Sequence, residues 1–161
     1  DLHRQLEPVL DERGAHAATF LAWAARLHEI GISIAQGAYH KHSAYILANA
    51  DMPGFSRQEQ GWLSNLVLAQ RGRLSKMRAA FDDDPSLATV ALCLRLAVIF
   101  HRSRRTAKFP PLRLARRAKG FRLEVDEDWL ARNSLVAIAL LAERGQWDSV
   151  GTGFEAVGSR L

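Results

Sequence analysis

The sequence has 161 residues, a length that suits a single domain. Hydrophobic residues make up 48% and charged residues 24%, a balance that excludes a disordered tail, a fibrous repeat and a disulfide-rich scaffold. No apolar run reaches the ~18 residues that a membrane-spanning helix needs, so we expect no membrane partner. The formal net charge of +5 is unevenly placed: residues 1–94 carry −1, residues 95–122 carry +10 without one acidic residue, and residues 123–161 carry −4. A hypothesis of anion binding therefore starts from residues 95–122.

The single cysteine and the first residue bear on the origin of the chain. Cys93 lies in an apolar run, which favours a buried, unreactive thiol. One cysteine cannot form a disulfide within the chain, so we expect a cytoplasmic location. The chain begins at Asp1 and not at Met, and we expect it to be the C-terminal part of a longer protein.

The spacing of apolar residues predicts helices along most of the first 108 residues. Phe20, Leu21 and Ala24 recur at helical intervals, and Gly31 is typical of a helix end. Ser56 followed by Glu59 is the pattern of a capping box, and Asp84 before a proline is typical of a helix start. The expected helices cover about 15–30, 39–50, 56–72 and 85–104.

The period of the pattern changes after residue 111. Residues 112–114 and 121–125 alternate apolar and charged side chains, with a turn at 118–120, which predicts a β-hairpin. A helix follows from Trp129, and residues 153–157 could add an edge strand. The sequence thus predicts one mainly α domain over 1–161, with a helical bundle at 1–108 and a small antiparallel β element, a helix and a tail at 109–161.

A cluster of histidines could bind a metal. His28 and Glu29 are followed closely by His40 and His42, and imidazole with carboxylate is a common ligand set.

Three stretches carry a family resemblance: WAARLHEIG (23–31), YHKHSAYILANADMPGFSRQEQ (39–60) and LRLAVIFHRSR (94–104). In this order they resemble the C-terminal domain of the exopolyphosphatase / guanosine pentaphosphate phosphatase family. The resemblance implies an HD-like helical bundle. It also implies a parent hydrolase whose catalytic residues and Mg²⁺ lie in two N-terminal actin-like domains, which would be partners of this domain within the same protein. We therefore expect no catalytic residue and no cofactor in this chain.

The resemblance to HD phosphohydrolases also suggests a degenerate metal site. His28-Glu29 stands where those enzymes have a His-Asp pair, and the distant aspartate would fall within 94–98, where Val98 offers no ligand. We expect no metal here, and expect His28 and Glu29 to cap their helix and bond to backbone. The alternative is a metal-dependent phosphohydrolase that uses His28, Glu29, His40 and His42.

The basic segment suggests a phosphate ligand. Arg95, Arg102 and Arg105 would share one side of the long helix, and 18 of the 22 basic residues are arginine, the forked donor that suits phosphate. In the family context the expected ligand is inorganic polyphosphate, and a solvated surface is the plain alternative. The candidate contacts are Lys41, His42, Arg95, Arg102, Arg104 and Arg105. We do not expect nucleic acid, because Phe121 should point to the core and no nucleic-acid motif accompanies the charge.

The leading hypothesis is the C-terminal domain of a cytoplasmic exopolyphosphatase that binds polyphosphate and supports a homodimer. The alternatives are the corresponding domain of a guanosine pentaphosphate phosphatase, the HD phosphohydrolase and a purely structural dimerisation module.

Overall fold

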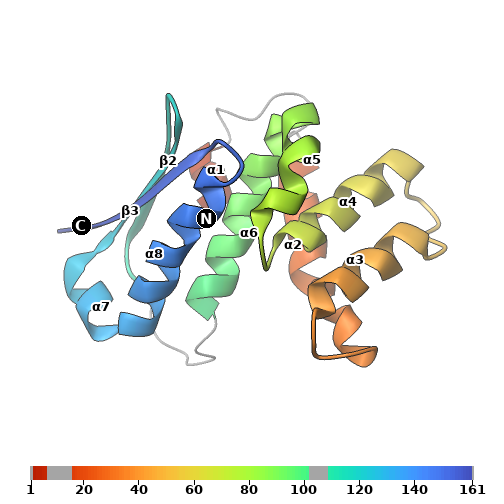
Figure 1. Cartoon of the computed structure of the whole chain (residues 1–161), viewed down its shortest axis with the longest axis horizontal. Helices are drawn as coiled ribbons and strands as arrows, with labels where there is room; N and C mark the ends of the chain where they lie inside the picture. Colours follow the sequence, from red (N-terminus) through yellow and green to blue (C-terminus); the bar gives the residue numbers. More distant parts are fainter. Residues whose placement is uncertain (1, 7–15, 102–108, 161) are drawn as a thin grey trace.

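Helices make up most of the structure, a computed structural model that describes residues 2–6, 16–101 and 109–160. The first part contains α1 (Leu2–Leu6), α2 (Ala17–Leu27), η3 (Ile30–Ser33), α3 (Tyr39–Asn49), α4 (Arg57–Ala69), η4 (Leu74–Met77), α5 (Arg78–Asp83) and α6 (Pro85–His101). The second contains β1 (Leu112–Arg117), β2 (Gly120–Asp126), α7 (Glu127–Arg132), α8 (Ser134–Asp148) and β3 (Gly153–Ser159). The predicted mainly α class with a small sheet near the C-terminus is confirmed (Figure 1).

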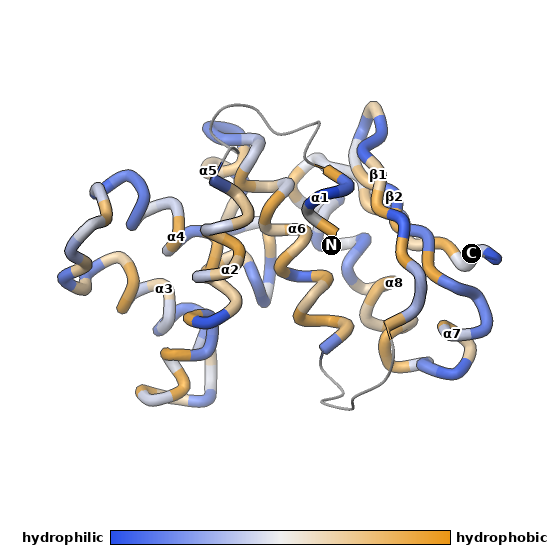
Figure 2. Tube along the Cα trace, turned by 180° about the vertical axis from the view of Figure 1, so that it is seen from behind, coloured by the Kyte–Doolittle hydropathy of each residue, from blue (hydrophilic) through white to orange (hydrophobic). Residues whose placement is uncertain are grey.

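The long helix α6 forms the centre of the molecule. It packs against α2, α4 and α5 on one side and against α8 on the other, and both ribbon views place it between the helical group and the sheet (Figures 1 and 2). Its residues are apolar nearly all round, which is the pattern of a helix surrounded by protein. Cys93 is buried within it as expected, and burial raises the pKa of the Cys93 thiol to about 12.

Two predicted helix starts are confirmed by their hydrogen bonds. At α4 the Ser56 hydroxyl accepts from the Glu59 backbone N–H (3.2 Å), and the Glu59 carboxylate accepts from the Ser56 N–H (2.7 Å). At α6 the Asp84 carboxylate accepts from the Ser86 N–H (2.9 Å). Its second oxygen accepts from the Trp62 indole (2.9 Å), so this residue also ties α4 to the start of α6.

The prediction that Gly31 ends the first helix is wrong. Helix α2 ends at Leu27, and Gly31 lies inside the following 3₁₀ turn. A Cβ atom at Gly31 would lie 2.3 Å from the Tyr39 carbonyl oxygen and 2.4 Å from the Ser43 nitrogen. This position therefore requires glycine because the first turn of α3 passes directly against it.

The sheet has the order β1-β2-β3. Strands β1 and β2 form the predicted antiparallel hairpin, with Leu114 opposite Leu123, and Phe121, Leu123 and Val125 are buried as the alternation predicts. The predicted edge strand is β3, which pairs with β2 in parallel, because α7 and α8 carry the chain back between the two strands. Within the described ranges, no helix is long and apolar enough to cross a membrane.

Candidate anion-binding site

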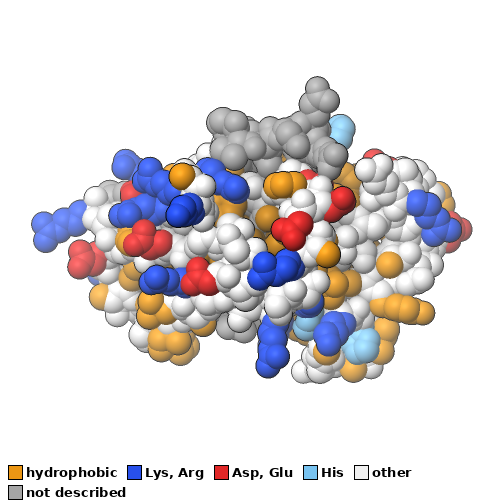
Figure 3. All heavy atoms as spheres, turned by 45° about the horizontal axis from the view of Figure 1, so that its top comes forward, with side chains coloured by type: hydrophobic (Ala, Val, Ile, Leu, Met, Phe, Trp, Pro, Cys, Tyr) orange, Lys and Arg blue, Asp and Glu red, His pale blue; other side chains and the backbone are white. Residues whose placement is uncertain are grey.

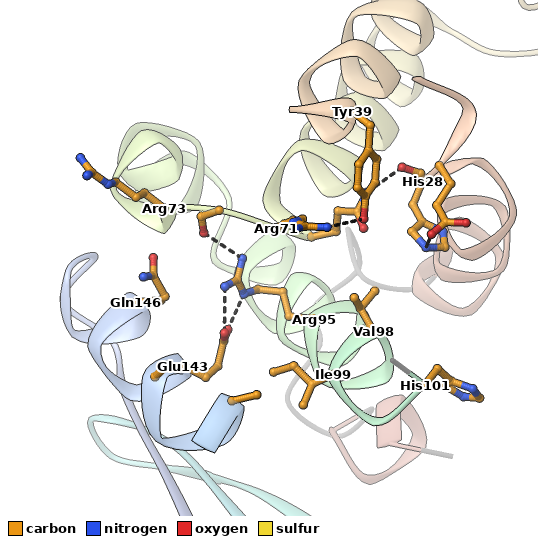
Figure 4. Close-up of a pocket in the computed structure, with 15 residues that line it drawn as sticks. His28, Tyr39, Arg71, Arg73, Arg95, Val98, Ile99, His101, Glu143 and Gln146 are labelled. Carbon is orange, nitrogen blue, oxygen red and sulfur yellow. Dashed lines mark hydrogen bonds and ion pairs between the residues drawn. The ribbon is translucent and has the colours of Figure 1, made fainter. Parts of the chain in front are cut away.

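A cavity of about 510 Å³ opens between the helical group and α8 (Figure 4). Its floor is apolar and consists of Val98 and Ile99 from α6 with Ala139 and Ala142 from α8. Its edge is polar and consists of His28, Glu29, Tyr39, Arg71, Arg73, His101 and Gln146. The three stretches that carry the family resemblance (23–31, 39–60 and 94–104) thus all contribute residues to the lining of this one cavity.

His28 and Glu29 stand at the edge of this cavity with their polar atoms turned to local partners. The His28 Nδ1 lies 2.9 Å from the Ala25 carbonyl oxygen, and its Nε2 lies 3.9 Å from a Glu29 carboxylate oxygen. The His28 carbonyl accepts from the Ser43 hydroxyl (2.9 Å) and from the Gln70 amide (2.7 Å). The His28 carbonyl therefore supports the junction of α2, α3 and the end of α4, whereas the Glu29 side chain makes no capping hydrogen bond.

The residues present do not fit the metal centre of an HD phosphohydrolase. Val98 contributes only an apolar side chain to the cavity floor. Across residues 2–6, 16–101 and 109–160, no three His, Cys, Asp or Glu side chains are grouped closely enough to hold a metal ion. We therefore derive no metal chemistry from this cavity.

The wall of the cavity is built on a buried ion pair between Arg95 and Glu143, each 5% exposed. The Arg95 Nε and Nη2 donate to the two Glu143 carboxylate oxygens, the second at 2.8 Å. The Arg95 Nη1 donates to the Ala69 (2.7 Å) and Gly72 (3.3 Å) carbonyls. The Trp147 indole donates to the same carboxylate (2.9 Å), so every charged atom of the pair has a protein partner.

Arg95 consequently fixes the loop that joins α4 to η4, residues 70–73. Gly72 in this loop has a left-handed φ of +77°, which glycine adopts without strain. The loop is also held by Lys76, whose Nζ donates to the Arg71 carbonyl (3.0 Å), and by Gln146, whose Oε1 accepts from the Leu74 N–H (3.0 Å). We call Lys41, Arg71, Arg73 and Lys76, which lie in and beside this loop, the loop cations.

Two titratable groups near the loop, His40 and Lys76, have lowered pKa values. The pKa of His40 is lowered from 6.5 to about 4, first by burial and then by Lys76, Arg71, Lys41 and Arg95. The Lys76 residue is exposed overall, but its ammonium group lies against the loop, and burial followed by Arg95 and Lys41 lowers its pKa to about 8. Burial is the larger cause of both shifts, and the neighbouring cations add a positive potential that favours an anion.

The candidate residues fall in different places. Lys41 is exposed in the first turn of α3 beside the loop, whereas His42 is half-buried with its Cβ near Gly31. Arg95, one of the predicted phosphate contacts, is buried and is paired with Glu143. Arg102, Arg104 and Arg105 lie outside the described residues.

Arg71, Arg73 and Lys76 were missed by the sequence analysis. The signal was present, because residues 71–78 contain four cations and no acid. It is lost when charge is averaged over residues 1–94.

The hairpin carries a second group of cations. Figure 3 shows Lys and Arg side chains gathered over this end of the molecule, and Arg113, Arg116, Arg117 and Lys119 are exposed there. The Arg116 guanidinium lies 4.6 Å from the centre of the Phe121 ring. Phe121 is buried, so it packs as a core residue and is not a platform for stacking nucleic-acid bases.

Comparison with known proteins decides the family. The family model described as Ppx/GppA phosphatase, domain III, matches residues 1–144. This chain belongs to the Ppx/GppA phosphatase family. The expected family is thereby confirmed, and its third domain is the part that this chain matches.

Similar proteins carry the name guanosine-5'-triphosphate,3'-diphosphate pyrophosphatase. One from Vibrio cholerae is 32% identical over 136 residues, which are 84% of this Ppx/GppA domain and 27% of the relative. Another from Pseudoalteromonas translucida is 33% identical over 132 residues (79% and 26%). A third from Vibrio atlanticus is 31% identical over 153 residues (90% and 31%). The chain thus spans less than a third of the length of these relatives.

Proposed function

We propose that this chain serves a Ppx/GppA phosphatase as a non-catalytic domain that binds the phosphate chain of the substrate at the loop cations. The observation that supports this most directly is the placement of Lys41, Arg71 and Lys76 around one fixed loop, where burial, followed by the charges of Arg95 and Lys41, lowers the pKa of Lys76 to about 8. A phosphate chain placed there would relieve the repulsion among these cations.

The arginines of the loop suit this task in two ways. Arg71 is oriented by Tyr39, because its guanidinium lies 5.2 Å from the centre of the Tyr39 ring and donates to the hydroxyl (3.3 Å). Arg73 is exposed and has no ion-pair partner in the described part of the chain. A guanidinium donates two parallel hydrogen bonds to phosphate, so each of these two arginines can hold a phosphate group.

The substrate class follows from shared chemistry. The sequence resemblance favours linear polyphosphate, whereas the relatives carry a name that specifies a guanosine nucleotide. Both ligands contain a phosphoanhydride chain, and it is this chain that the loop cations would bind. Hydrolysis with Mg²⁺ would take place in other domains of the parent enzyme, in the cytoplasm.

The test is binding of long-chain polyphosphate to this chain at increasing salt. Affinity should fall log-linearly with salt, by roughly 0.7 in slope for each phosphate neutralised on a single-stranded polyanion. The Arg71→Gln/Arg73→Gln variant should lower the slope by about 1.4. The control Arg57→Gln/Arg132→Gln removes two exposed arginines outside the cavity and should change it little. Absence of binding at low salt, or equal losses in both variants, would refute the proposal.

A second role, dimerisation, is favoured by a separate observation. Leu135, Ile138 and Leu141 on α8 are 82%, 62% and 71% exposed, and they lie along one face of the helix at intervals of three residues. Exposed apolar stripes of this kind mark interaction surfaces. We propose that this stripe contributes to a homodimer. Sedimentation velocity should show a dimer that Leu135→Gln/Leu141→Gln converts to a monomer. A monomeric wild-type chain at high micromolar concentration would exclude this role.

A further inference from the structure

The Lys76 side chain carries an amine that has no acidic partner. Its Nζ donates to the Arg71 carbonyl (3.0 Å), and none of the ion pairs within the described ranges involves Lys76. A Cβ atom at Gly72 would lie 3.6 Å from this Nζ and 3.2 Å from the His40 Nε2. The amine therefore stands against the loop backbone near a second nitrogen base, on a residue that is exposed overall.

The charges that act on this amine are positive. They belong to Arg95 of α6 and Lys41 of α3. Arg95 has Glu143 of α8 as its own counterion, and burial followed by the surrounding cations keeps His40 neutral near pH 7. Burial, followed by Arg95 and Lys41, lowers the pKa of the Lys76 amine to about 8. A desolvated lysine beside another cation is a common form of nucleophilic amine in proteins.

We propose that Lys76 is acylated by small acyl phosphates, whose phosphate group is held by Lys41 and Arg71 while the Lys76 amine attacks the acyl carbon. The proposal rests on the proposed function, since it uses the loop cations to bind phosphate. The amine nitrogen forms a bond to the acyl carbon, and the bond from that carbon to the phosphate oxygen breaks. The phosphate leaves as hydrogen phosphate, with the proton that the amine loses. The product is a neutral amide, so the loop loses one positive charge.

An acyl phosphate matches both features of this cluster. Its phosphate is an anion that the loop cations attract, and its acyl carbon is an electrophile that a neutral amine attacks. Lys76, Arg71 and Lys41 all add to burial in lowering the pKa of His40 to about 4, so these three cations surround one place. A phosphate group bound there would bring the acyl carbon close to the amine, whereas a neutral acyl donor would gain nothing from the charge.

The expected selectivity follows from the fraction of neutral amine. With a pKa of about 8, about a quarter of the Lys76 amine is neutral at pH 7.5, against about a thousandth at the ordinary value of 10.5. A less basic nucleophile is also intrinsically weaker, which reduces the expected gain in rate to about tenfold. Lys119 is a stringent internal control, because it is exposed at the hairpin beside Arg116 and Arg117. A cationic surface alone would attract an anionic reagent to it equally.

The experiment is acetylation of this chain at pH 7.5 by acetyl phosphate and by the neutral N-hydroxysuccinimide ester of acetic acid, with the rate at each lysine measured by peptide mass spectrometry. The ester should acetylate Lys76 about tenfold faster than Lys119, and acetyl phosphate should raise this ratio by a further factor of about three. Lys41→Gln should remove the further factor, and Arg57→Gln, at an exposed position on α4, should keep it. Comparing the two reagents cancels any change in the nucleophilicity of Lys76.

The outcomes separate this proposal from the proposed function. Equal rates at Lys76 and Lys119 with both reagents overturn the acylation site. A Lys76 amine that reacts fast with the ester but gains nothing with acetyl phosphate also overturns it, because no phosphate is then held beside the amine. Polyphosphate binding without selective acetylation leaves the proposed function in place. Selective acetylation of Lys76 by acetyl phosphate without polyphosphate binding overturns the proposed function alone.

Discussion

The buried pair of Arg95 and Glu143 allows a direct test of what holds the cavity wall. The variant Glu143→Gln keeps the shape of the side chain and an oxygen that can accept from the Trp147 indole. It removes the negative charge, and leaves the Arg95 guanidinium buried at 5% exposure without a counterion. The expected result is a large loss of stability with little change in fold.

The magnitude follows from the partners that remain. Removing one member of a buried ion pair costs about 3–5 kcal/mol. Arg95 keeps its bonds to the Ala69 and Gly72 carbonyls, so we expect the lower end, about 3 kcal/mol. The double variant Arg95→Met/Glu143→Leu removes both charges, leaves the Ala69 and Gly72 carbonyls short of a donor and leaves the Trp147 indole without its acceptor. It should lose about 1–3 kcal/mol, no more than the single variant, although it changes two core residues.

The assay is urea unfolding followed by tryptophan fluorescence, to which Trp147 beside Glu143 contributes. A matched control is Glu155→Gln, because Glu155 pairs with Arg122 at 3.1 Å on an exposed strand. Exposed pairs contribute about 0–1 kcal/mol, so the control should stay within that range. If Glu143→Gln unfolds within 1 kcal/mol of the wild-type chain, Arg95 does not depend on its counterion and the account of the wall is wrong.

Three further predictions concern the surroundings of the loop. Gly31→Ala should lower the free energy of unfolding by about 3 kcal/mol through overpacking, because its Cβ would meet backbone at 2.3 Å. The control is Gly61→Ala in α4, where an added Cβ meets nothing within 4 Å, and it should raise this free energy by about 0.5–1 kcal/mol. If the two variants change urea unfolding equally, the close approach of α3 to Gly31 is contradicted. The folded chain favours neutral His40, whose pKa falls from 6.5 to about 4. Neutral His40 therefore makes its full contribution to the free energy of unfolding above pH 6.5. As the pH falls toward 4, about 2 kcal/mol of this free energy is lost, after allowance for screening by solvent. Unfolding curves of the wild type and of His40→Gln at pH 7 and 4.5 would show this. If both proteins lose the same free energy of unfolding between these pH values, His40 is not the group responsible. A bound phosphate chain should raise the pKa of Lys76 from about 8, so binding near pH 9 should take up a proton. Calorimetry in buffers of different ionisation enthalpy measures this uptake, and its absence would place the anion away from Lys76.

Local sequence patterns were sufficient for the parts of the fold that depend on near neighbours. The capping box of Ser56 and Glu59 spans three residues, and the hairpin around 118–120 is set by alternation on both sides of a turn. Each of these signals lies within a few residues, where backbone preferences and side-chain periodicity act. They predicted the mainly α class and the hairpin.

The features that define the site depend on residues far apart in the chain. From the sequence alone Arg95 is interpreted as a cation open to a ligand, because its partner Glu143 is 48 residues away in the chain. Gly31 reads as a helix end because the helix that crowds it begins at Tyr39 and reaches it only in the folded chain. The parallel direction of β3 likewise depends on the route taken by α7 and α8. Tertiary packing decided all three, and periodicity contains no information about it.

The sign of the charge explains why this cleft suits an anion and not a metal. Glu143, the one fully buried carboxylate of the cavity wall, is neutralised by Arg95, while Arg71 and Arg73 stand at the edge without a carboxylate partner in the described part of the chain. The positive charges of Arg95 and Lys41, which add to burial in lowering the pKa of Lys76 to about 8, would repel a divalent cation and attract phosphate. With the apolar Val98 in its lining and loop arginines at its edge, the charge of this cavity thus favours an anion over a metal ion. Introducing a carboxylate by Val98→Asp should therefore weaken phosphate-chain binding, and titration with Mn²⁺ should still show no stoichiometric metal uptake.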